Sequence, residues 1–117
     1  MEAQLKKGLI DPCVLAVIRC GDTYGYRLVS DVSGVMEVTE STLYPVLRRL
    51  EGGGFLRTYS VEHNSRLRKY YAITHEGEAR LDAYKNELMN VKRVIDFIVS
   101  TQAASQSGEF LNTGGAQ

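Results

Sequence analysis

The stretch from Glu37 to Ile73 constrains the fold of this 117-residue chain most strongly. It opens with cap residues and a helical pattern that runs to Glu51, and three consecutive glycines at 52–54 then stop that helix. Glycine accepts the left-handed conformation that a helix exit needs. Two strand-like segments and a cluster of basic residues follow. A helix, a glycine stop and a basic hairpin in this order predict a winged helix-turn-helix, a mainly α fold with a small β-hairpin.

The helix before the glycines is predicted to begin near Ser41, because Pro45 would cost a backbone hydrogen bond in a helix that starts earlier. Ser41 and Thr42 near its start, with Tyr44 and Arg48 beyond, suit entry into a DNA groove, where arginine can bind guanine or phosphate through two hydrogen bonds. The two hydroxyl residues could instead serve only as helix caps. Four apolar residues at helical spacing form the stripe expected to be buried: Leu43, Val46, Leu47 and Leu50.

The segments on either side of a polar turn at 62–66 alternate in polarity and are rich in β-branched and aromatic residues, which predicts a hairpin. Two strands alone are marginally stable, so one face must pack on the helices. Tyr71 and Ile73 are predicted on that face. A charged hairpin can also be a solvated edge that resists aggregation. The basic residues expected to meet phosphate or the minor groove are Arg66, Arg68 and Lys69.

Asp11 and Pro12 predict the start of the first helix, because aspartate caps free N–H groups and proline at the first helical position loses no hydrogen bond. The preceding segment, 4–10, is interpreted as an arm, either helical or irregular. Its Lys6 and Lys7 could contact the DNA backbone or could simply be solvated.

A pair of cap residues at 22–23 predicts a second helix at 24–32. Gly25 weakens that helix by about 1 kcal/mol relative to alanine, which indicates a close backbone approach at this position. Tyr24 and Tyr26 could each pack in the core or hydrogen-bond to a phosphate, and we expect at least one of them to pack.

Thr74 is predicted to cap the last helix, which carries two glutamates in its first turn, where they favour the helix dipole. Apolar residues then recur at alternating spacings of three and four, the pattern of a heptad seam. The seam is larger than one small domain can cover, so a second copy is expected to cover it in a symmetric dimer, while part of the face packs on its own domain. The seam residues are Leu81, Tyr84, Leu88, Val91, Ile95 and Ile98.

These elements predict a winged helix-turn-helix domain at 1–74, a dimerisation helix at 75–100 and a flexible tail at 101–117. The chain has 14 basic and 14 acidic residues and no net charge, so any binding of nucleic acid must use local positive charge. No apolar run approaches the roughly 20 residues of a membrane span, and the N-terminus lacks a secretory h-region. A cytoplasmic location is expected.

Cys13 and Cys20 would lie about 10 Å apart on one helix, too far for a disulfide, and are interpreted as small buried apolar residues. Neither cysteine forms a metal-ligand spacing with His63 or His75. Neither histidine has an evident nucleophile as partner, so no enzyme is predicted. We therefore expect neither a metal nor a cofactor.

Five motifs stand in an order typical of PadR-type transcriptional regulators, a family that the chain resembles over residues 5–100. The segments with leucine-tyrosine-proline and with arginine-lysine-tyrosine-tyrosine are the most specific. With its single short C-terminal helix, the chain resembles the subfamily that has one such helix and includes the lactococcal multidrug regulator. The motifs are Lys7-Gly8-Leu9, Tyr24-Gly25-Tyr26, the run from Thr42 to Glu51, Arg68-Lys69-Tyr70-Tyr71 and Thr74-x-x-Gly77.

The resemblance implies a homodimeric repressor that binds an inverted-repeat operator and releases it when an effector binds. In the multidrug regulator, a tryptophan of the last helix stacks on flat drugs, whereas this chain has no tryptophan and carries Leu88 or Met89 near that place. A smaller apolar effector could still fit. By position, Ser41, Thr42, Tyr44 and Arg48 match the recognition helix, and Arg66, Arg68 and Lys69 match the wing.

An alternative hypothesis is a winged-helix module that binds other proteins and has no specific affinity for DNA. The zero net charge and the apolar seam favour it.

Overall fold

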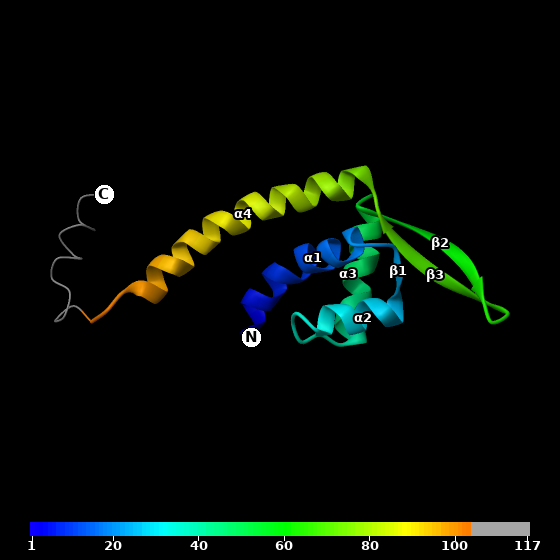
Figure 1. The fold of residues 1–117 in the computed structure, drawn as a ribbon, viewed down its shortest axis with the longest axis horizontal. Helices are drawn as coiled ribbons and strands as arrows, with labels where there is room; N and C mark the ends of the chain where they lie inside the picture. The colour runs from blue at the N-terminus through cyan, green and yellow to red at the C-terminus, as the bar shows by residue number, and fades with distance from the viewer. Residues whose placement is uncertain (104–117) are drawn as a thin grey trace. The chain divides into compact units, whose positions relative to one another are not determined.

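The computed structural model describes residues 1–103, and the chain divides into two compact units, Met1–Lys85 and Asn86–Gln117. The part described contains four helices and one antiparallel sheet with strand order β1-β3-β2, which confirms the predicted winged helix-turn-helix (Figure 1). The elements are α1 (Ala3–Arg19), β1 (Thr23–Tyr24), α2 (Gly25–Ser33), α3 (Glu40–Gly52), β2 (Leu56–His63), β3 (Arg66–Ile73) and α4 (His75–Ser100).

Helix α1 extends from Ala3 to Arg19 and contains Pro12, so the predicted helix start at Asp11 and Pro12 was wrong. The carboxylate of Glu2 caps the helix instead, and accepts hydrogen bonds from two backbone N–H groups of the first turn at 2.9 and 3.1 Å. A proline inside a helix costs about 3 kcal/mol. Pro12 is buried together with Ile10 and Val14, and this packing offsets the lost hydrogen bond.

The two residues Thr23 and Tyr24 form a strand, although the sequence predicted a cap and a helix start there. They pair antiparallel with Tyr71 and Tyr70 of β3, and α2 begins only at Gly25. A strand this short has no periodicity of its own. Its hydrogen bonds are to residues nearly fifty positions later, and local sequence does not contain that information.

The wing, which we define as β2, β3 and their turn, is tighter than predicted. Only Asn64 and Ser65 connect the strands, instead of a five-residue polar loop, and both have positive φ angles of 50° and 65°. Positive φ at both central residues matches the twist of the flanking strands, and asparagine tolerates that conformation well. The paired region therefore extends from Leu56 opposite Ile73 to His63 opposite Arg66.

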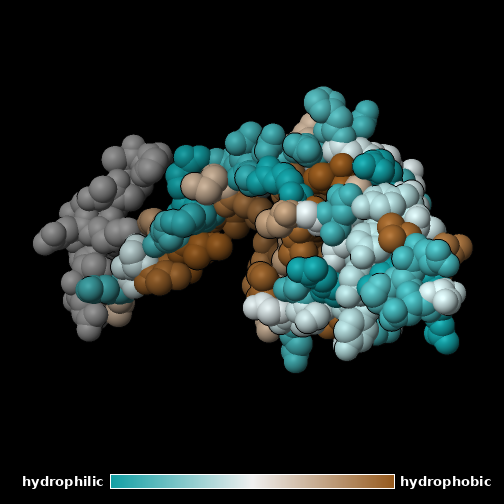
Figure 2. Space-filling model, turned by 45° about the vertical axis from the view of Figure 1, so that its right-hand side comes forward, coloured by the Kyte–Doolittle hydropathy of each residue, from teal (hydrophilic) through white to brown (hydrophobic). Residues whose placement is uncertain are grey.

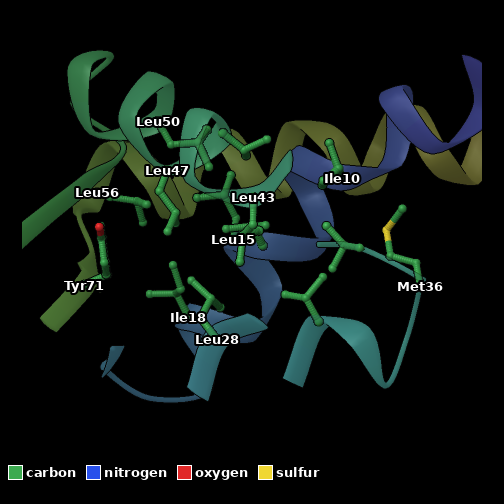
Figure 3. Packing of buried hydrophobic residues seen from close by; sticks show 14 of the residues in the cluster. Ile10, Leu15, Ile18, Leu28, Met36, Leu43, Leu47, Leu50, Leu56 and Tyr71 are labelled. Carbon is green, nitrogen blue, oxygen red and sulfur yellow. The ribbon is translucent and has the colours of Figure 1, made fainter. Parts of the chain in front are cut away.

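The core of the first unit lies among α1, α2, α3 and the base of the sheet (Figure 3). Leu15 and Ile18 of α1 meet Leu28 of α2 there. Tyr71 is buried and Ile73 packs against the same cluster, as predicted for the inner face of the hairpin. The predicted stripe of α3 is also buried along its whole length: Leu43, Val46, Leu47 and Leu50.

The three glycines end α3 as predicted. Gly54 has a φ of +83°, and its N–H donates to the carbonyl of Glu51 at 3.0 Å. The N–H of Phe55 donates to the carbonyl of Leu50 at 2.9 Å, which completes the paired bonds of a Schellman motif. The start of α3 at Glu40 is one residue earlier than expected, and Pro45 consequently lies inside the helix.

The start of α4 is tied to the end of α3. The hydroxyl of Thr74 accepts the N–H of Gly77 at 2.9 Å, which confirms the predicted cap, and it donates to the carbonyl of Gly54 at 2.6 Å. The N–H of Thr74 donates to the carbonyl of Phe55 at 3.1 Å. A Cβ at Gly77 would overlap that same carbonyl oxygen. We call these bonds the α3–α4 tie, and they explain the spacing of threonine and glycine in the last motif.

The first turns of α4 belong to the first compact unit, which extends past residue 74 to Lys85. Leu81 is only 2% exposed in the core, and Tyr84 packs against the same cluster. Both were predicted in the seam, part of which was expected to pack on its own domain, and Leu81 and Tyr84 lie in that part. Leu81 follows the helical spacing of the seam, and that pattern does not distinguish a contact within the chain from one between chains.

The rest of the predicted seam is on the second unit. Leu88 is half-buried, whereas Val91, Ile95 and Ile98 are exposed. Figure 2 shows hydrophobic residues gathered along one side of α4, with hydrophilic ones on another. The predicted flexible tail lies outside the described residues from position 104 onward.

Candidate nucleic-acid interface

The outer face of α3 carries Ser41, Thr42 and Arg48, which are all exposed because the buried stripe occupies the opposite face. The hydroxyl of Thr39 lies 3.0 Å from that of Ser41 and 3.2 Å from that of Thr42. Thr39 is the N-cap residue, and its side chain makes no hydrogen bond to the backbone of the helix. The hydroxyl groups thus bond to one another, and this arrangement weighs against the alternative that they act only as caps.

Tyr44 faces the protein, although the sequence placed it among the DNA contacts. Its ring is half-buried, and a Cβ at Gly25 would overlap it. Burial raises the pKa of Tyr44, with smaller contributions in the same direction from Glu40 and Tyr71. The close approach predicted at Gly25 is therefore confirmed, and Tyr44 packs α3 against α2.

A hollow of about 570 Å³ runs between α1 and α3. Lys6 and Lys7 line it on the side of α1, and Thr42 and Arg49 line it on the side of α3. Arg49 is held there by Asp11, whose carboxylate oxygen lies 2.5 Å from its guanidinium nitrogen. The fold thus brings the two predicted lysines, Lys6 and Lys7, beside α3. Arg49 was not among the predicted DNA contacts, although its place next to Arg48 on a polar helix face could have suggested it.

The basic residues of the wing lie on two different faces. Arg66 and Arg68 share the outer face, and Arg66 is exposed beside the turn. Lys69 lies on the inner face, where its amino group is 3.7 Å from the carboxylate of Glu51 in α3. Lys69 is therefore paired with α3, although we expected it to be free near the base of the hairpin.

A row of three tyrosines crosses the outer face of the sheet, and we call Tyr24, Tyr59 and Tyr70 the tyrosine row. Tyr70 stacks on Tyr59 with ring centres 5.6 Å apart, and it meets the edge of Tyr24 at 5.5 Å. Arg68 lies over the ring of Tyr24, 4.0 Å from its centre. One of the two early tyrosines does pack, as expected, whereas Tyr26 is 76% exposed.

Tyr59 also reaches the loop before β1. Its hydroxyl donates to the carboxylate of Asp22 at 2.6 Å, and this bond is the main cause that raises the pKa of Tyr59. Asp22 was predicted to cap a helix, and it accepts this side-chain bond instead. The role of Tyr59 was not predicted, because this role depends on the register of β2 against β3.

The two cysteines differ in their surroundings. Cys13 is half-buried, and burial raises the pKa of its thiol. Cys20 is exposed at the end of α1, so its predicted burial was wrong. Across residues 1–103, no group of three or more potential side-chain ligands could hold a metal ion. No helix in the same range is long and apolar enough to cross a membrane.

A family model of PadR-like transcriptional regulators matches residues 14–83. The chain belongs to the PadR-like family. A relative from Lysinibacillus sphaericus, described as uncharacterized protein X, is 31% identical over 104 residues, covering 85% of this chain and 95% of its own. The match confirms the resemblance seen in the five motifs, and PadR-like proteins regulate transcription rather than catalyse reactions.

Solved structures show the same fold as this PadR-like chain. A protein from Streptococcus mutans is 40% identical, with a TM-score of 0.74 over 82% of this chain and 91% of that one. A transcriptional regulator from Clostridium thermocellum is 30% identical, with a TM-score of 0.76 over 84% and 100%. A PadR-like regulator from Bacillus cereus is 26% identical, with a TM-score of 0.77 over 86% and 100%. PadR-like regulators act by binding DNA.

Proposed function

We propose that this PadR-like protein is a homodimeric repressor that binds an inverted-repeat operator in duplex DNA and releases it when a small apolar effector binds. The observation that carries the proposal is the exposed polar face of α3, with the lysines of α1 lining the hollow beside it. Lys6 and Lys7 lie beside it on α1, and Arg66 lies on the wing. In helix-turn-helix proteins the second helix enters the major groove while neighbouring elements contact the backbone.

Two kinds of contact follow from this arrangement. Ser41, Thr42 and Arg48 are exposed on α3. Their hydroxyl and guanidinium groups would meet base edges or the adjoining phosphates. Lys6, Lys7 and Arg66 would contact phosphates, which fix the position of a protein on DNA but carry little sequence information. Tyr44 and Lys69 contribute indirectly, since they hold α3 against α2 and the wing.

The exposed apolar residues of α4 support a dimer. Burying apolar surface stabilises an assembly by about 25 cal/mol per Å². A second copy of the same helix is the simplest cover for such a face, and it gives a symmetric pair. Two α3 helices would then meet half-sites about one turn of DNA apart. Val91, Ile95 and Ile98 are aliphatic, so an effector that enters between copies would be small and apolar.

The proposal is tested by fluorescence anisotropy with a duplex from the protein's own upstream region and a scrambled duplex of equal length. We expect binding of the upstream duplex to exceed that of the scrambled one at physiological salt. A screen for small apolar compounds that release the bound duplex then tests the effector. Compounds that release it should leave the fold intact by circular dichroism.

A second candidate function, a protein-binding module, is favoured by the zero net charge and the exposed apolar face of α4. It predicts equal and weak binding of both duplexes even at low salt. That result would overturn the regulator and leave the module. We place the protein in the cytoplasm, where it would meet the DNA that it regulates.

A further inference from the structure

The apolar contacts of the wing with the core lie at its base. Leu56, Tyr71 and Ile73 contact the core, whereas every residue from 60 to 67 is exposed. At about 3.3 Å per residue the tip lies roughly 20 Å from the core, so a tilt of about 10° moves it by roughly 3–4 Å. Phosphate contacts tolerate less displacement than that, because hydrogen bonds weaken beyond about 3.2 Å. The ion pair of Lys69 with Glu51 ties one face of the wing to α3. A wing that contacts DNA at a fixed place also needs an anchor on its other face.

The tyrosine row and Asp22 supply that anchor. In the sheet order β1-β3-β2, Tyr24, Tyr70 and Tyr59 lie directly opposite one another on the three strands. The bond from Tyr59 to Asp22 joins the outer strand β2 to the loop before β1, which are the two edges of the sheet. This hydrogen bond therefore spans β3 without involving the backbone of β3, and it links the wing to the helical part of the unit as a brace.

Arg68 is part of the same brace. Its guanidinium lies over the ring of Tyr24 and is half-buried, so its charge is engaged within the protein. Arg66, two residues nearer the tip on the same face, forms no ion pair within residues 1–103. The two arginines, which look equivalent in the sequence, therefore occupy different situations.

We propose that Asp22, Tyr59 and Arg68 are positioning residues, which hold the wing at one angle so that Arg66 meets the DNA backbone. The inference rests on the proposed DNA binding and names residues that act through another one. It separates Arg66, which would touch phosphate, from Arg68, which would not.

The brace is first tested without DNA. Nitroxide labels are attached to Ser65→Cys at the tip and to Ser30→Cys on α2, in a background with Cys13→Ala and Cys20→Ala. Pulsed electron paramagnetic resonance then measures the distance between the wing and the helices. The labelled protein is diluted with unlabelled chains. Tyr59→Phe and Asp22→Ala, which remove the donor and the acceptor of the bond, should broaden the distribution or shift it. Tyr70→Phe is the matched control, because it removes a hydroxyl from the same row without removing the bond to Asp22. Distributions that stay narrow and unshifted would overturn the brace.

DNA binding then tests the positioning role. Tyr59→Phe, Asp22→Ala and Arg68→Ala should each weaken operator binding by about three- to tenfold. Each should have little further effect in an Arg66→Ala background, because the positioned group is then already gone. Sequence preference, which α3 sets, should not change. A contact of Arg68 with phosphate would instead make Arg66→Ala and Arg68→Ala additive, each lowering the salt slope by about one, and would overturn its assignment.

The two experiments separate the two ideas. In one outcome, the unaltered protein fails to bind the operator while Tyr59→Phe still broadens the distance distribution. That pair of results would overturn the proposed function and the role of the brace in it, but not the brace itself. Operator binding that Tyr59→Phe leaves unchanged, despite a broadened distance, would overturn the positioning role alone.

Discussion

Arg48 and Tyr44 are one turn apart on α3, yet their side chains meet different surroundings. Arg48 is exposed, whereas Tyr44 packs on Gly25. We expect Arg48→Ala to change the preferred base at one or two operator positions, at a cost of about 1–3 kcal/mol in discrimination. Tyr44→Phe keeps the packing and should leave sequence preference unchanged. Competition binding against a set of single-base operator variants measures both, and an altered preference in Tyr44→Phe would contradict the inward position of the ring.

Gly25 and Gly8 are two helical glycines in opposite situations. A side chain at Gly25 would meet the ring of Tyr44, whereas the space around Gly8 in α1 is open. Gly25→Ala should lower the free energy of unfolding by about 1–3 kcal/mol through overpacking. Gly8→Ala should raise it by about 0.5–1 kcal/mol, since alanine restricts the unfolded chain and favours the helix. Urea denaturation measures both, and an unaffected Gly25→Ala protein would contradict the close approach.

The thiols of Cys13 and Cys20 should react at different rates. Burial shields Cys13 and raises the pKa of its thiol, so at any given pH less of it is the reactive thiolate than in an unperturbed cysteine. Cys20 is exposed. With a disulfide reagent under native conditions, Cys20 should be labelled first, and Cys20→Ser should remove the fast phase. A fast phase that persists in Cys20→Ser would show that Cys13 is accessible.

Among the elements, those set by local signals were predictable. The glycine stop of α3, its buried stripe and the cap of α4 at Thr74 all follow from residues close together in the chain. The continuation of α1 through Pro12 and the short strand β1 were not predictable, because contacts with distant elements decide them. The same division holds for the site. Exposed faces of α3 were predictable from periodicity, whereas the pairing of Lys69 and the packing of Arg68 depend on tertiary neighbours.

The α3–α4 tie leads to a prediction at the level of elements. Gly77→Ala would place a methyl group on the carbonyl oxygen of Phe55, so the first turn of α4 would have to move away from the end of α3. We expect a loss of about 2–4 kcal/mol in stability and faster amide exchange at residues 74 and 77, whose N–H groups donate within the tie. Gly52→Ala is the control, since nothing lies within 4 Å of the added group. Equal effects from the two changes would argue against the tie.

For the whole molecule, the seam of α4 has two parts with different roles. Leu81 is a core residue of the first unit, whereas Ile95 is half exposed on the second. Ile95→Glu should give a folded monomer that binds operator much more weakly, because two half-sites must be bound together. Leu81→Glu should unfold the domain itself, since a buried charge has no partner there. Sedimentation and thermal unfolding distinguish the two outcomes. A dimer that survives Ile95→Glu would place the interface elsewhere.

A chain with no net charge can still bind DNA if its positive groups are gathered at one surface. Lys6, Lys7 and Arg49 line one hollow, and Asp11 neutralises only the last of them. Local charge of this kind implies modest affinity for DNA in general and a strong dependence on the correct sequence. The molecule would accordingly spend little time on non-operator DNA at physiological salt.

The α3–α4 tie also makes the tip of the wing replaceable. The bonds of Thr74 to Gly54 and Phe55 close the chain into a loop at the base of the hairpin, whatever residues form its tip. The two-residue turn at Asn64 and Ser65 is fully exposed and contacts no core residue. Exposed loop tips accept insertions and substitutions most readily. Tips of other lengths and charges could therefore be grafted between Glu62 and Leu67 to retune backbone contacts, while the helices that choose the sequence stay as they are.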